Sequence, residues 1–112
     1  MMRTETIKKV LELKRADFNL AQYALDKGHS ITVDYGEEDG CTKSKDFNQI
    51  KEAADAICDE YHMHIYDSEN RKLGWAWVVY GNEDHELVAD YTANKFMDEW
   101  WASYEEAYGD EM

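Results

Sequence analysis

Apolar residues in the first quarter of the chain recur at the intervals of an amphipathic helix. Between Thr4 and Lys27 they stand three, four and seven positions apart, which predicts one helix over this stretch. They are Ile7, Val10, Leu11, Phe18, Ala21 and Leu25. Gly28 follows directly, in the place where helices commonly end in a left-handed residue. Ser30–Tyr35 then alternates apolar and polar side chains, which predicts a strand.

The next stretch changes from turn-forming residues to a helical pattern. Glycines, acids and small polar residues occupy the positions from Gly36 to Lys45, which predicts a loop. Asp46, followed three positions later by Gln49, is typical of a helix N-terminus. Apolar residues keep helical spacing from there, so we expect a second amphipathic helix that ends near Glu60.

Two runs rich in β-forming residues come next. His62–Tyr66 and Lys72–Tyr80 are joined by a short polar connector, which predicts a β-hairpin. The second run separates its side chains by size: Leu73, Trp75, Trp77 and Val79 share one face, and Gly74, Ala76, Val78 and Tyr80 share the other. The small residues of the second face would let a helix approach the sheet closely.

The last quarter contains one ambiguous segment and one clear helix. Glu86–Thr92 suits a third strand of the meander, although its apolar residues also fit a helix that starts at Asn82. Helical spacing then resumes between Asn94, a suitable N-cap, and Gly109. The apolar residues of this helix are Phe96, Met97, Trp100, Trp101, Tyr104 and Tyr108. The pattern predicts an α+β fold in the order α-β-α-β-β-β-α, with helices packed on a mainly antiparallel sheet of about four strands.

Length and composition restrict the class of protein. The chain has 112 residues, which suits a single domain over 1–112. It carries 25 acids against 12 lysines and arginines, for a net charge of −13, and this argues against direct binding to nucleic acids or anionic membranes. There is no apolar run of membrane-spanning length, no signal-peptide core in Met1–Arg15 and no disulfide framework, so we expect a cytoplasmic protein.

The surplus negative charge belongs to the second part of the chain. Residues 1–51 hold nine bases and nine acids, whereas residues 52–112 hold three bases against 16 acids. The second part also contains all four tryptophans and six of the eight tyrosines. Because aromatic side chains anchor interfaces and carboxylates steer a basic partner, this composition indicates an interaction surface. Solubility is the competing explanation for the acidity, but it does not explain why the imbalance is confined to one part.

Residues with catalytic or metal-binding chemistry are few. His62 and His64 would share one face of a strand, a spacing that can chelate zinc, and Asp84 and His85 would have to fold next to them to complete a site. The alternative is a pair of half-exposed histidines on a sheet. The acidic stretch that begins at Asp34 does not match a calcium loop, and no nucleophile elbow or phosphate-binding loop is present. We expect no catalytic residues, no metal and no cofactor.

The last predicted helix is the strongest candidate for a binding surface. Its apolar stripe is flanked by two pairs of acids, Asp98 with Glu105 and Glu99 with Glu106, each pair about 10 Å apart along the axis. Rows of carboxylates on a rigid element can imitate the charges of a nucleic-acid backbone. An ordinary solvated acidic face is the alternative.

We predict that three acidic groups and one tryptophan contact a basic partner. The predicted partner-binding residues are Glu37, Glu38, Asp39, Glu83, Asp84, Glu86, Asp98, Glu99, Trp101, Glu105 and Glu106. Two adjacent tryptophans on a helix cannot both point inward in so small a domain, so one of Trp100 and Trp101 should lie near the surface.

In size, charge and richness in tryptophan and tyrosine, and in stretches such as Lys72–Tyr80 and Asp98–Tyr108, the chain resembles the small acidic proteins of bacteriophages and mobile elements. Several of those proteins inhibit restriction enzymes or CRISPR effectors by presenting a DNA-like charged surface. The resemblance implies a non-enzymatic inhibitor or regulator of a basic, nucleic-acid-binding host defence protein, acting in a bacterial cell as a monomer or homodimer. The neutral first part departs from DNA mimics that are acidic throughout.

Two other functions stay open on the sequence. One is a structural or assembly module that forms a homodimer through an apolar patch containing Trp100 or Trp101. The other is a small metal-dependent enzyme that uses His62 and His64.

Overall fold

The computed structural model describes residues 13–35, 38–57, 59–81, 83 and 86–109. Its helices and strands are α2 (Ala16–Asp26), β1 (Ser30–Tyr35), β2 (Glu38–Ser44), α3 (Phe47–Asp55), β3 (Glu60–Tyr66), β4 (Lys72–Val79), β5 (Val88–Tyr91) and α4 (Lys95–Tyr108). The predicted α+β class is therefore confirmed. Within the described ranges, no helix is both long enough and apolar enough to cross a membrane.

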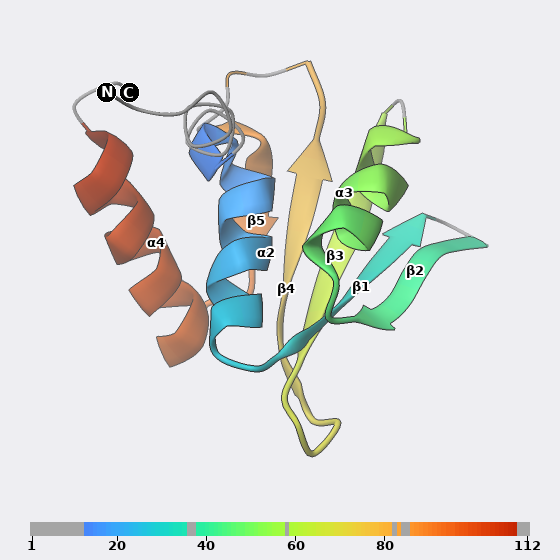
Figure 1. The fold of residues 1–112 in the computed structure, drawn as a ribbon. Coiled ribbons are helices and arrows are strands. Elements are labelled where there is room, and N and C mark those ends of the chain that lie inside the picture. The colour runs from blue at the N-terminus through green and yellow to red at the C-terminus, as the bar shows by residue number, and fades with distance from the viewer. Residues whose placement is uncertain (1–12, 36–37, 58, 82, 84–85, 110–112) are drawn as a thin grey trace, which may run out of the picture.

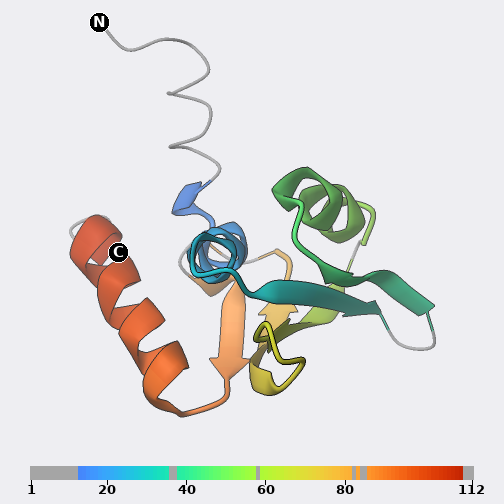
Figure 2. The same cartoon turned by 60° about the horizontal axis from the view of Figure 1, so that its bottom comes forward.

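The strands form one antiparallel sheet in the order β2-β1-β3-β4-β5. Figures 1 and 2 show α2 and α3 over the same face of this sheet, with α4 beside α2 toward the β5 edge. The core lies between this face and the helices, where Ile31, Met63, Ile65 and Ala76 are completely buried. The sheet has five strands rather than the predicted four or so.

The additional strand, β2, occupies the stretch predicted as a loop. Its glycine serves packing and not a turn: a Cβ at Gly40 would lie 3.1 Å from side-chain atoms of both Val33 and Ala53. Two register shifts along the β1–β2 ladder, and a positive φ of 48° at Lys43, let turn-forming residues run as an irregular edge strand. Composition indicated a loop because bulged edge strands use the same residues as turns.

The predicted helix from Thr4 to Lys27 is wrong as a single element. Its positions 4–12 lie outside the described residues, and α2 begins only at Ala16, because the backbone of Arg15 is extended (ψ 126°). That break lets Arg15 turn back onto the completely buried Asp17, with Nη2–Oδ2 and Nε–Oδ1 distances of 2.9 and 3.2 Å. The end of the helix is as predicted, since Gly28 has a φ of 83°.

The second predicted helix is shorter than expected. Asp46 is its N-cap, as predicted, and accepts a hydrogen bond from the Asn48 backbone. The helix ends at Asp55 and not near Glu60. Tyr61 fits both the helical spacing and the alternation of β3, and its pairing with Val78 on β4 decides for the strand.

The remaining strand predictions are confirmed. β1 has the predicted bounds, β3 and β4 form the hairpin, and the ambiguous segment contains β5, paired through Ala76 and Tyr91. The small-residue face of β4 does receive a helix: a Cβ at Gly74 would lie 3.0 Å from the Cγ of Met97 on α4.

Candidate interaction surface on α4 and β5

Helix α4 is held firmly against the body of the protein. Asn94 caps it, as predicted, by accepting a hydrogen bond from the Met97 backbone. Along its buried stripe, the Trp100 indole donates to the side chain of Asn19 at 3.0 Å, and the Tyr104 hydroxyl donates to the Lys14 carbonyl. Since both polar groups of these buried aromatics are satisfied, α4 presents its other side chains from a fixed position.

The two adjacent tryptophans have different environments. Trp100 is completely buried, whereas Trp101 is partly exposed, in line with the expectation that one of them lies near the surface. Trp101 packs against Tyr91 on β5 and Tyr104 on its own helix, with ring centroids 6.3 and 5.6 Å apart. Trp100 is therefore a core residue, and Trp101 is the tryptophan of α4 that a partner can reach.

One flank of α4 joins β5 in an acidic–aromatic strip, which we define as Asp90, Tyr91, Asp98, Trp101 and Glu105. The pKa of the Tyr91 hydroxyl is raised, first by burial and then by the negative charges of Asp98, Glu105 and Asp90. Carboxylates from two elements thus act on one phenol beside an accessible indole. Such a surface favours cationic side chains, through ion pairing and through cation–π contact with Trp101 or Tyr91.

The second row of α4 acids faces solvent. Glu99 and Glu106 are exposed, and Lys95, the only base of this helix, has its Nζ 3.9 Å from Oε1 of Glu99. An exposed pair at that distance neutralises little of the local field. The helix therefore carries four exposed carboxylates on two sides of Trp101.

The other predicted contact residues divide between two places. Glu83 and Glu86 are exposed in the connection between β4 and β5, and the Glu86 amide donates to the Glu83 carbonyl. They lie toward the β5 edge, as α4 does, and Asp84 lies outside the described residues. Glu37 also lies outside them.

Glu38 and Asp39 belong to β2, at the edge of the sheet opposite β5. The structure therefore does not bring Glu38 and Asp39 together with α4.

The histidine pair is on one sheet face, as predicted. The rings of His62 and His64 are stacked 6.2 Å apart, and Nε2 of His64 lies 3.5 Å from Oδ2 of Asp34 on the neighbouring strand. His85 and Asp84 lie outside the described residues. Among the residues that are described, no group of three or more His, Cys, Asp or Glu side chains is arranged to hold a metal ion.

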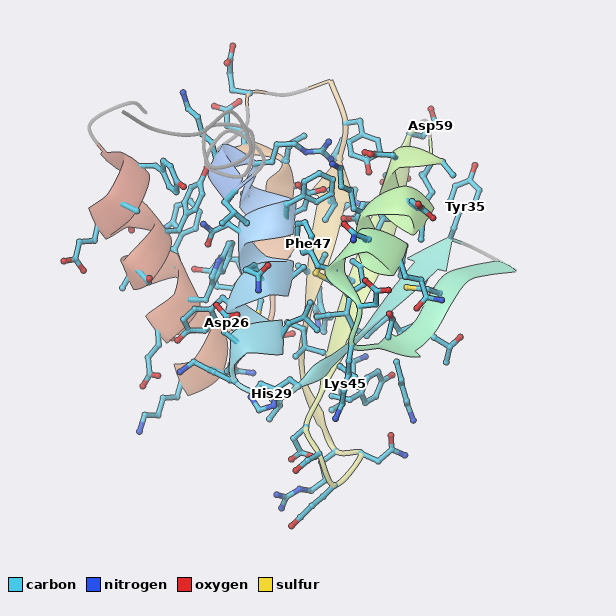
Figure 3. All side chains as sticks on the ribbon, viewed as in Figure 1. Asp26, His29, Tyr35, Lys45, Phe47 and Asp59 are labelled. Carbon is cyan, nitrogen blue, oxygen red and sulfur yellow. The ribbon has the colours of Figure 1, made fainter. Side chains whose placement is uncertain are left out.

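Sequence reasoning missed two features. One is the contribution of Asp90 and Tyr91 to the strip, which depends on β5 lying beside α4. The other is an open hollow of about 340 Å³ at the end of the sheet where Tyr35 and Asp59 lie close together (Figure 3). Its described lining consists of Asp34, Tyr35, Asp59, Glu60, Tyr61 and His62. Both features combine acids from different elements, and no local sequence signal connects them.

Comparison with protein-family models, with curated proteins and with solved structures found no match for this chain.

Proposed function

We propose that this protein is a non-enzymatic inhibitor or regulator that binds a basic, nucleic-acid-handling protein in the cytoplasm of a bacterial cell, and that the acidic–aromatic strip is its main contact. The packing of Tyr91 on β5 against the accessible Trp101 on α4, with the exposed acids Asp98 and Glu105 on the same helix, carries this proposal, and the raised pKa of Tyr91 agrees with it. Solubility alone does not require an accessible tryptophan beside such acids.

The charge density of α4 argues for a mixed contact rather than a full imitation of DNA. From Asp98 to Glu106 the helix rises about 12 Å and carries four carboxylates, or one charge per ~3 Å. Duplex DNA carries one charge per ~1.7 Å of its axis. With about half that density, the strip needs its aromatic side chains to add affinity once charge has oriented the partner.

The test uses the full chain as affinity bait in a bacterial lysate, followed by binding measurements with the protein that is captured. We expect a basic nucleic-acid-binding protein whose own nucleic-acid binding is displaced by the bait. The double variant Asp98→Asn/Glu105→Gln should weaken the complex at least about tenfold, because it removes two carboxylates without changing side-chain shape.

The matched control is Glu52→Gln/Glu69→Gln, which removes two exposed charges from α3 and from the β3–β4 connection. It should leave the affinity near that of the original chain. If the two double variants lost the same affinity for the partner, the effect would come from net charge and not from the acidic–aromatic strip. An affinity that stays constant from about 50 mM to about 400 mM salt would contradict electrostatic recognition.

A further inference from the structure

One face of the sheet is left without a covering helix among the described elements. Residues opposite one another on paired strands point to the same side, so the register defines this uncovered sheet face. Its three central rows are Asp34, His62, Trp77 and Asp90; Thr32, His64 and Trp75; and, after a register shift between Ile65 and Tyr66, Ser30, Tyr66 and Lys72. Trp77 is 37% exposed, and apart from Tyr35 it is the most exposed large hydrophobic side chain that the structure describes.

The uncovered sheet face is acidic at one end and basic at the other. At the acidic end, Glu60 accepts a hydrogen bond from the Trp77 indole at 2.6 Å, and Asp34 and Asp90 lie in the same row as Trp77. At the basic end, Lys72 pairs with Tyr66, and Nζ of Lys43 lies 4.7 Å from the centre of the Tyr66 ring. Figure 3 shows the same separation along the strands, with Tyr35 and the acid Asp59 near one end of the sheet and the base Lys45 near the other.

Aromatic rings occupy the middle of this face. The rings of His62 and Trp75 are 6.3 Å apart, and those of His62 and His64 are 6.2 Å apart. The position of Lys72 on this face agrees with the lowered pKa of His64, which burial causes first and the charge of Lys72 second. The face thus has an aromatic centre between two ends of opposite charge.

We propose that the uncovered sheet face pairs with the same face of a second copy of this chain, in a two-fold dimer whose strands run in opposite directions. Sheets stack face to face about 10 Å apart. A two-fold axis lying across the strands places Lys72 of one copy opposite Trp77 and Glu60 of the other, and Lys43 opposite the end that holds Asp34. An axis along the strands would instead oppose lysine to lysine, so charge selects the first arrangement.

The small area of the uncovered sheet face limits the affinity of the two copies for each other. Four strands at about 4.8 Å and six residues at about 3.3 Å give roughly 20 by 20 Å per copy, or about 800 Å² over both copies, which is smaller than a standard stable interface and suits a weak, transient one. Both copies also carry a net charge of −13, which opposes association. We expect a dimer that dissociates in the micromolar range. Apart from Asp90, the acidic–aromatic strip lies outside this interface, so this inference does not rest on the proposed function.

The test is a charge-exchange experiment followed by sedimentation equilibrium from about 1 μM to about 1 mM protein. In the two-fold dimer, position 72 of each copy faces position 60 of the other, so there are two such contacts. Lys72→Glu makes both contacts acid against acid, and Glu60→Lys makes both base against base. Each variant should therefore raise the dissociation constant at least about tenfold. In an equimolar mixture of the two variants, both opposed pairs become complementary again, and a heterodimer should form. Both positions are exposed, so circular dichroism should show both variants folded.

Lys95→Glu is the matched control, because it makes the same change in net charge on α4. It should leave the dimer unchanged. The proposal is overturned by a monomer at every concentration, which would leave the face to a different partner. It is also overturned by equal effects of Lys95→Glu and Lys72→Glu, or by a mixture that stays monomeric.

Discussion

At the scale of single residues, Asp17 is the most constrained group in the described structure. It is completely buried, and it accepts hydrogen bonds from Arg15, from the Phe18 amide and from the Tyr61 hydroxyl at 3.0 Å. The pKa of Tyr61 is raised, by burial first and by the charge of Asp17 second. The same two causes raise the pKa of Tyr80 to about 12. Burial lowers the pKa of Arg15, but the charge and hydrogen bond of Asp17 outweigh it, so the net shift is upward.

We predict that Asp17→Ala lowers the free energy of unfolding by about 2–4 kcal/mol, because it leaves the buried Tyr61 hydroxyl without this acceptor and the half-buried guanidinium of Arg15 with its longer contact to Asp55. Asp55→Ala is the control. Asp55 is an exposed acid 3.4 Å from the same guanidinium, and its loss should cost less than about 1 kcal/mol. Urea denaturation of the two variants measures the difference. Equal costs would show that the Asp17 network adds no more than a surface ion pair.

At the scale of elements, the contact between β4 and α4 positions the candidate site. Gly74 lies against Met97, and the next turns of α4 carry Asp98, Trp101 and Glu105. Because glycine lets the helix lie directly on the strand, the acidic–aromatic strip reaches Tyr91 on the next strand. The closeness of this packing therefore sets the distance between the two halves of the strip.

Gly74→Ala should destabilise the protein by about 1–3 kcal/mol, because the added methyl group overpacks the contact with Met97. In a Met97→Ala background the same substitution should cost less, since the space is then available. Gly109→Ala is the matched control: nothing lies within 4 Å of its added Cβ, and its φ of −58° suits alanine. Thermal unfolding compares the four variants, and additive effects of Gly74→Ala and Met97→Ala would contradict direct contact.

The elements themselves were predictable to different degrees. Strands β1, β3 and β4 and helix α4 follow from local periodicity, because each has a clear apolar face and a recognisable end. β2 and the end of α3 could not be predicted from local periodicity, because Gly40 and Tyr61 each suit two local structures. Their long-range partners, Val33 for Gly40 and Val78 for Tyr61, decide between them.

At the scale of the whole molecule, the two proposed surfaces lie on different sides of the protein. The acidic–aromatic strip lies along α4 and β5, whereas the uncovered sheet face lies on the side of the sheet opposite the helices (Figures 1 and 2). Asp90 is the residue that both regions share. A partner bound along α4 therefore leaves the central strands of the other face open to a second copy.

Variants of the two surfaces should act independently. Lys72→Glu should abolish dimerisation at micromolar concentration and leave the affinity of the monomer for its basic partner unchanged. Asp98→Asn/Glu105→Gln should do the reverse, and the combined variant should show both losses additively, because the sites share none of the substituted residues. Sedimentation and partner-binding titrations on the same samples measure both effects. Loss of partner binding in Lys72→Glu would place the two functions on one surface.

The amino-acid sequence by itself determined the α+β class, the caps at Asp46 and Asn94, the apolar stripe of α4 and the concentration of acids beyond Lys51. These properties depend on neighbours a few positions away, which share a helix turn or a strand. The tertiary structure alone decided that Glu38 and Asp39 lie at the far edge from α4, that Tyr91 joins Trp101, and that Trp75 and Trp77 stay on an uncovered face. Those outcomes depend on strand order and helix placement, which are set by the joint burial of apolar surfaces distant in sequence.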